Sequence, residues 1–99
     1  MVDAIMEAIT VKVLLFASAR EAAGNVSSID CTLEKNDNQI ADTALLRRTL
    51  ASQYPKLAPL VTNEDNLTLA VNEEYVPVGE VIGLKNGDTV ALIPPISGG

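Results

Sequence analysis

The 99-residue sequence contains no histidine, no tryptophan and a single cysteine, Cys31. Without histidine, the chain cannot form a Cys/His zinc site, a histidine general base or a Ser-His-Asp triad from its own side chains. One cysteine cannot form a disulfide within the chain, and free cysteines are commonly small buried residues rather than nucleophiles. We therefore expect no metal site, a buried Cys31, and chemistry that does not rest on this chain's own catalytic side chains.

Basic residues are also scarce: 7 lysines and arginines stand against 13 acidic residues, for a formal net charge of −6. Nucleic acid and anionic membranes are poor partners for such a chain, because both bind basic patches. A basic protein surface is a better match. No apolar run approaches the roughly 18 residues of a membrane span, and residues 1–8 resemble neither a secretory signal nor a transit peptide. We expect a cytosolic protein without membrane or nucleic-acid partners.

Alternating apolar residues predict three strands, over residues 9–17, 67–72 and 89–93, and a weaker pattern predicts another over 26–33. A tight turn at Asn72-Glu73 would lead into a short strand at residues 75–76, and Asn86-Gly87 marks a further turn. The outward face of the first strand is polar at Thr10 and Lys12 but apolar further along. This change predicts that something covers the far end of the strand.

One main helix is predicted over residues 43–54, because Leu46, Leu50 and Tyr54 recur at helical spacing. Asp42 is the expected N-cap, and Pro55 ends the helix. Residues 20–23 are expected to form a short helical turn that stops at Gly24, and residues 57–65 a loop with at most a single turn.

The order of these elements predicts an α+β fold in which one helix packs across one mixed sheet. It fits the ubiquitin-like β-grasp arrangement, with the first and last strands parallel at the centre of the sheet. The expected organisation is an N-terminal extension (1–8), a single β-grasp domain (9–93) and a projecting tail (94–99).

The tail has the sequence PPISGG. Pro94 and Pro95 lack backbone N–H groups, so they end strand pairing and direct the chain outward. Gly98 and Gly99 have no side chains and fit a narrow channel. The α-carboxylate of Gly99 becomes reactive once it is activated, for example by adenylation, and sulfur can then convert it to a thiocarboxylate. A mobile chain end without function is the simpler alternative.

Three segments together resemble the small, sulfur-carrier subunit family of molybdopterin synthase: residues 11–17 (VKVLLFA) followed by Arg20-Glu21, residues 70–72 (AVN) and residues 86–99 (NGDTVALIPPISGG). The ending PPISGG is the most specific of them. The resemblance implies that Gly99 is adenylated by an enzyme of the ubiquitin-activating type and converted to a thiocarboxylate. The tail, with Pro94, Pro95, Ile96, Ser97 and Gly98, would enter the large subunit and deliver sulfur to cyclic pyranopterin monophosphate, forming the molybdopterin dithiolene.

The resemblance further implies a heterotetramer of two small and two large subunits, with the catalytic side chains on the large subunit. No permanently bound cofactor is expected, because ATP is consumed by the activating enzyme. Phe16 and Ile93 are predicted to point away from the core on neighbouring strands. With Tyr75 and Ile96 they would form an exposed apolar patch near the tail, and in the family these positions of Phe16, Tyr75 and Ile93 contact the large subunit. The alternative is that these side chains are scattered, or covered by the N-terminal extension.

Other functions remain open at the level of sequence. The chain can be a ubiquitin-like modifier whose Gly99 is joined to a lysine, a sulfur carrier for thiamin synthesis or tRNA thiolation, or an interaction module with an irrelevant tail. Only the last of these would keep its function if a residue were added after Gly99.

Overall fold

The computed structural model describes residues 7–35 and 40–95 of the chain. Along the sequence, the secondary-structure elements are β1 (Glu7–Leu15), α1 (Ala17–Ala22), β2 (Ser28–Lys35), α2 (Thr43–Gln53), the 3-10 turn η1 (Pro55–Leu57), α3 (Ala58–Val61), the 3-10 turn η2 (Glu64–Asn66), β3 (Thr68–Val71), β4 (Glu74–Tyr75) and β5 (Thr89–Ile93). The predictions for residues 1–6 and 96–99 concern positions outside the described residues.

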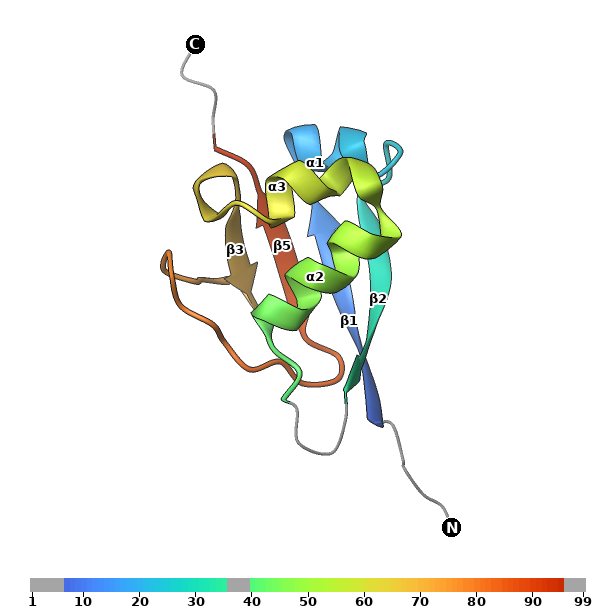
Figure 1. The fold of residues 1–99 in the computed structure, drawn as a ribbon, viewed down its shortest axis with the longest axis vertical. Helices are drawn as coiled ribbons and strands as arrows, with labels where there is room; N and C mark the ends of the chain where they lie inside the picture. Colours follow the sequence, from blue (N-terminus) through green and yellow to red (C-terminus); the bar gives the residue numbers. More distant parts are fainter. Residues whose placement is uncertain (1–6, 36–39, 96–99) are drawn as a thin grey trace.

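The strands form one mixed sheet in the order β2-β1-β5-β3-β4. β1 and β5 are parallel neighbours at the centre, whereas every other neighbouring pair in this order is antiparallel. Helix α2 crosses one face of the sheet, and α1 and α3 lie together at one end (Figure 1). The predicted α+β arrangement, with the first and last strands parallel at the centre, is confirmed.

Aliphatic side chains fill the space between α2 and the sheet. The core-facing residues of the two central strands and of α2 are almost fully buried: Val11, Val13, Leu15, Leu46, Leu50, Val90 and Leu92. Cys31 of β2 also faces this core, and burial raises the pKa of its thiol. A thiol that is buried and hard to ionise is a poor nucleophile, so the prediction for Cys31 is confirmed.

Helix α2 begins as predicted, because the backbone N–H of Leu45 donates a hydrogen bond to the Asp42 carboxylate at 2.8 Å. The helix ends at Gln53, with Tyr54 as its C-cap and Pro55 directly after. The prediction of a loop over residues 57–65 was wrong in part. Leu57 and Val61 are buried, and this burial accounts for the helical segments η1 and α3, which pack against α2.

The ends of the first two strands also differ from the prediction. β1 starts at Glu7 because Glu7 and Ala8 extend the ladder with β2, and it stops at Leu15 because Phe16 is the N-cap residue of α1. β2 lies two residues later than expected, at Ser28–Lys35. The pairing between β1 and β2, which the local pattern does not contain, determines the start of β1 and the position of β2, whereas the start of α1 determines where β1 stops.

Candidate protein interface

The face of the sheet opposite α2 is polar at one end and apolar at the other. At the apolar end, strand register places four side chains in one row across the sheet: Leu14 pairs with Ala91, Ala91 with Ala70, and Ala70 with Tyr75. Directly paired residues present their side chains on the same face. Alternation turns this row away from α2, since the next residue of each central strand is buried on the α2 side. Leu14 and Ala91 are half-buried, and Ala70 is 7% exposed.

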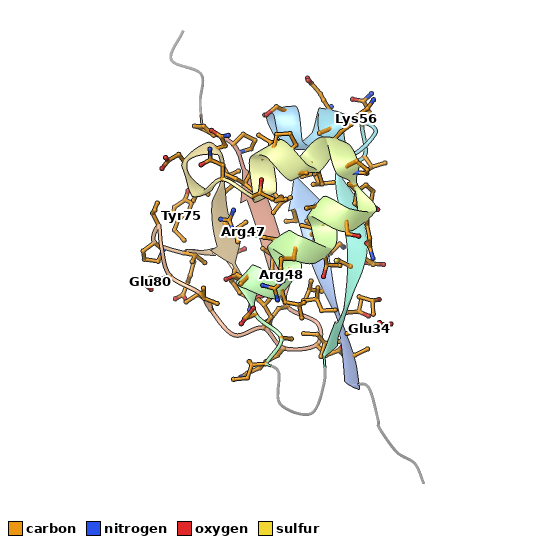
Figure 2. All side chains as sticks on the ribbon, in the orientation of Figure 1. Glu34, Arg47, Arg48, Lys56, Tyr75 and Glu80 are labelled. Atoms are coloured by element: carbon orange, nitrogen blue, oxygen red, sulfur yellow. The ribbon has the colours of Figure 1, made fainter. Side chains whose placement is uncertain are left out.

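The three predicted interface residues lie at this end. Leu15 and Leu92 are register partners. Phe16 and Ile93 directly follow them in sequence, so these two residues lie side by side where β1 and β5 end. Phe16 is 48% exposed and Tyr75 is 72% exposed, while Ile93 is half-buried. Figure 2 shows Tyr75 at the edge of the sheet formed by β3 and β4. We define the outer apolar patch as Leu14, Phe16, Ala70, Tyr75, Ala91 and Ile93.

One detail of the Phe16 prediction needs correction. Phe16 does not belong to the strand, because it caps α1 with an extended backbone (φ −124°, ψ 148°). An extended conformation continues the strand alternation for one further residue, so the side chain still points away from the core. The functional role of Phe16, Tyr75 and Ile93 stays a prediction.

The tail leaves the sheet beside this patch. β5 ends at Ile93, Pro94 is buried and Pro95 is exposed. β1 and β5 both run toward the end of the molecule where α1 lies (Figure 1). The described part of the tail therefore leaves from the end of β5 that carries Ile93. Ile96, Ser97, Gly98 and Gly99, which the sequence assigns to tail insertion and sulfur transfer, lie outside the described residues.

A clasp of hydrogen bonds fixes the β3–β4 hairpin, which carries Tyr75. The side-chain amide of Asn72 donates to Asp88 Oδ1 at 3.0 Å, and Asn72 Oδ1 accepts from the backbone N–H of Thr89 at 3.0 Å. The backbone N–H of Lys85 donates to Asp88 Oδ2 at 2.8 Å. The hydrogen bond from Asn72, and then that from Lys85, lowers the pKa of the Asp88 carboxyl. The clasp ties the hairpin to the turn before β5.

We predict that Asp88→Asn destabilises the protein in a pH-dependent way. Since the folded pKa of Asp88 lies below its unfolded value of about 3.9, its carboxylate stabilises the fold above that pH, and this contribution disappears as pH falls through the lowered folded pKa. In urea unfolding, the free energy of unfolding of Asp88→Asn is expected to be lower by about 0.5–1 kcal/mol at pH 7. This difference is expected to shrink below about pH 4. The exposed Asp30→Asn serves as the control, and an equal loss in both variants at pH 7 would contradict the role of the clasp.

Comparison with protein-family models gives a match over residues 13–99 to the model described as the ThiS family. The chain belongs to the ThiS family. The match begins at Val13, near the end of β1, and runs through Gly98 and Gly99, so it includes the other strands of the sheet and the tail.

Among the curated relatives of this ThiS-family chain, a molybdopterin synthase sulfur carrier subunit of Aedes aegypti is 34% identical over 94 residues, covering 94% of this chain and 92% of the relative. A protein of the same name from Chlamydomonas reinhardtii is 38% identical over 89 residues, covering 90% and 98%. The solution structure of small archaeal modifier protein 1 from Methanosarcina acetivorans superposes with a TM-score of 0.70 at 24% identity, covering 94% of this chain and 99% of that one. This last likeness shows a shared ubiquitin-like fold. The predicted family and the β-grasp fold are confirmed.

Metal-binding clusters and membrane-spanning helices are both absent from the described part of the ThiS-family chain. Across residues 7–35 and 40–95, no cluster of acidic or cysteine side chains is arranged to hold a metal ion. No helix in those same ranges has both the length and the apolar character needed to cross a bilayer.

Sequence reasoning did not identify the partnership of Asn72 with Asp88 or the row formed by Leu14, Ala70 and Ala91. The alternation of apolar residues indicated the outward face of each strand, but the register between strands is set by tertiary pairing. The segments AVN and NGD were singled out as parts of the family pattern, and Asn72-Glu73 and Asn86-Gly87 were also predicted as turns. The structure shows that hydrogen bonds join these two segments.

Proposed function

We propose that this chain is the sulfur-carrier subunit of a molybdopterin synthase and that the carboxyl group of Gly99 carries the sulfur. The observation that carries the proposal is its similarity, over at least nine-tenths of its length, to relatives named for that role. The family match extends through Gly98 and Gly99, the residues that sulfur transfer would use.

The proposed chemistry begins with a carboxylate, which is a poor electrophile. An activating enzyme of the ubiquitin-activating type transfers AMP from ATP to the Gly99 carboxylate, forming an acyl adenylate and releasing pyrophosphate. A sulfur donor then displaces AMP and leaves a thiocarboxylate, whose sulfur is a better nucleophile than a carboxylate oxygen. Transfer of this sulfur to cyclic pyranopterin monophosphate, followed by hydrolysis of the acyl group, restores the carboxylate. Two such transfers build the dithiolene.

In this proposal the catalytic side chains belong to the large subunit, and ATP is a substrate of the activating enzyme rather than a bound cofactor. The outer apolar patch would dock on the large subunit while Pro94 and Pro95 direct Ile96, Ser97, Gly98 and Gly99 into its active site. The assembly would be a cytosolic heterotetramer of two small and two large subunits. Desolvation of Phe16, Tyr75 and Ile93 would stabilise it.

Intact mass measurement tests the carrier chemistry directly. The purified chain is incubated with ATP, a sulfur donor and an activating enzyme of the molybdopterin pathway. We expect the mass change for replacing one oxygen by sulfur, mapped to Gly99 by fragmentation. No change, with an enzyme that is active on another carrier, would contradict the proposal. Conjugates to lysines of other proteins would instead indicate a modifier.

We predict that Phe16→Ala and Ile93→Ala each weaken the complex with the large subunit by about 1–3 kcal/mol, because each removes apolar contact area from the centre of the interface. Isothermal titration calorimetry measures the change. Thr32→Ala, an exposed position on β2, is the control and is expected to bind like the unmodified chain. Unchanged affinity in both test variants would show that the outer apolar patch is not the docking surface.

A further inference from the structure

A shallow hollow lies on the outer face of the sheet, inside the outer apolar patch and beside the β3–β4 hairpin. Its volume is about 310 Å³, and it is lined by Leu14, Ala70, Asn72, Glu73, Thr89 and Ala91. Register explains the floor, because Ala91 of β5 is paired with Leu14 of β1 and with Ala70 of β3. Two adjacent alanines leave room that larger side chains would fill. We call this feature the alanine hollow.

The two hairpin residues at the rim differ in what they can still bind. Both polar atoms of the Asn72 side chain are already used in the clasp with Asp88 and Thr89. The exposed Glu73 side chain, in contrast, has no hydrogen bond or ion pair with any residue in the described ranges. The alanine hollow therefore presents one available carboxylate at the edge of a mainly apolar floor.

The backbone at Glu73 is conformationally unfavourable. Asn72 and Glu73 have φ values of +50° and +74°, the pattern of a type I′ turn, in which glycine is favoured at the second position. A residue with a Cβ is disfavoured in this left-handed region. Glycine at position 73 would be more stable, so a glutamate at the rim of a hollow points to a functional role for its carboxylate.

We propose that the alanine hollow receives an arginine side chain of the large subunit. The aliphatic part of the arginine lies over Ala70 and Ala91, and its guanidinium pairs with the Glu73 carboxylate. Long basic side chains cover apolar surface while their charged ends remain accessible, and the planar guanidinium matches a carboxylate in two parallel hydrogen bonds. The net charge of −6 favours a basic partner surface. The identity of the partner rests on the proposed function.

The test compares the Kd of the complex with the large subunit for the unmodified chain, Glu73→Gln and a control, Glu34→Gln. Glu34 is exposed on β2, at the edge of the sheet opposite Tyr75 (Figure 2), so the control removes the same charge at a distance. At low salt, Glu73→Gln is expected to weaken binding about 10-fold and Glu34→Gln less than about 2-fold. The difference in affinity between Glu73→Gln and the unmodified chain is expected to shrink at higher salt, because salt screens the attraction between the Glu73 carboxylate and the guanidinium.

Glu73→Gly distinguishes the contribution of the carboxylate to binding from the effect of the turn conformation on stability. Since glycine relieves the unfavourable φ, Tm is expected to rise by about 4 °C, while affinity falls by the same factor as in Glu73→Gln. A more stable chain that binds less well is the signature of a carboxylate retained for binding. If Glu73→Gln binds like the unmodified chain, the proposal is overturned, and it is also overturned if only Glu73→Gly loses affinity.

Double-mutant cycles identify the occupant. Each arginine of the large subunit that faces the patch is changed to alanine and titrated against the unmodified chain and Glu73→Gln. For one arginine, the change to alanine is expected to weaken binding of the unmodified chain about 10-fold and to change the binding of Glu73→Gln little. Coupling to a lysine, or to no basic residue, would overturn the arginine assignment. Failure of the unmodified chain to bind the large subunit would instead contradict the proposed function itself.

Discussion

Adding one alanine after Gly99 is expected to abolish sulfur transfer while folding and binding to the large subunit remain intact. The extension moves the terminal carboxylate by about 3.5 Å and places a Cβ where the tail has only glycine. In an active site, a misplacement of about 1 Å can lower a rate about 100-fold. We therefore expect transfer to fall to the background, both for formation of the thiocarboxylate and for delivery of sulfur to the pterin.

Intact mass measures formation of the thiocarboxylate, a single-turnover assay measures delivery of sulfur to the pterin, and calorimetry measures binding to the large subunit. The matched control carries the same alanine before Met1 and is expected to transfer sulfur normally. If the chain extended after Gly99 still transfers sulfur, the assignment of Gly99 as the carrier is wrong. If the extension abolishes binding as well, the tail contributes more to docking than the outer apolar patch.

Leu92→Ala is expected to have the largest effect on stability, about 3 kcal/mol. Leu92 is fully buried and stands between its register partners Leu15 on β1 and Leu69 on β3. The substitution opens a cavity in the core beside the central strands of the sheet, where backbone pairing on both sides limits relaxation. Because a domain of this size has a total stability of about 5–15 kcal/mol, the loss is a large fraction of it. Urea unfolding at pH 7 measures the change.

Ile93→Ala is the natural control, because Ile93 is the next residue of β5 and faces the opposite side. We expect it to lower stability by less than about 1.5 kcal/mol, since the side chain is only half-buried, while it weakens the complex. Leu92→Ala should show the reverse, with large destabilisation and near-normal affinity of the folded chain. Equal destabilisation by both substitutions would contradict the division of β5 into a core face and a docking face.

Much of the fold could be predicted because its signals are local. The spacing of Leu46, Leu50 and Tyr54 indicated the helix, and Asp42 and Pro55 marked its ends. Alternating residues indicated the strands on either side. The ends of β1 and β2 were missed because the ladder between the two strands and the start of α1 at Phe16 set them. The helical segments near Leu57 and Val61 were missed because they are stabilised by burial in the core, which a local pattern does not show.

The family, the helix and its cap, the buried Cys31 and the absence of histidine chemistry could be read from the sequence, because these depend on residue type and on spacing along the chain. Three features required the three-dimensional fold: Ala91 lies between Leu14 and Ala70, Asn72 is hydrogen-bonded to Asp88, and Glu73 lies at the rim of the alanine hollow with an unfavourable φ. These features join β1, the β3–β4 hairpin and β5, which lie far apart in the sequence. Strand register brings them together, and register is a property of the whole sheet.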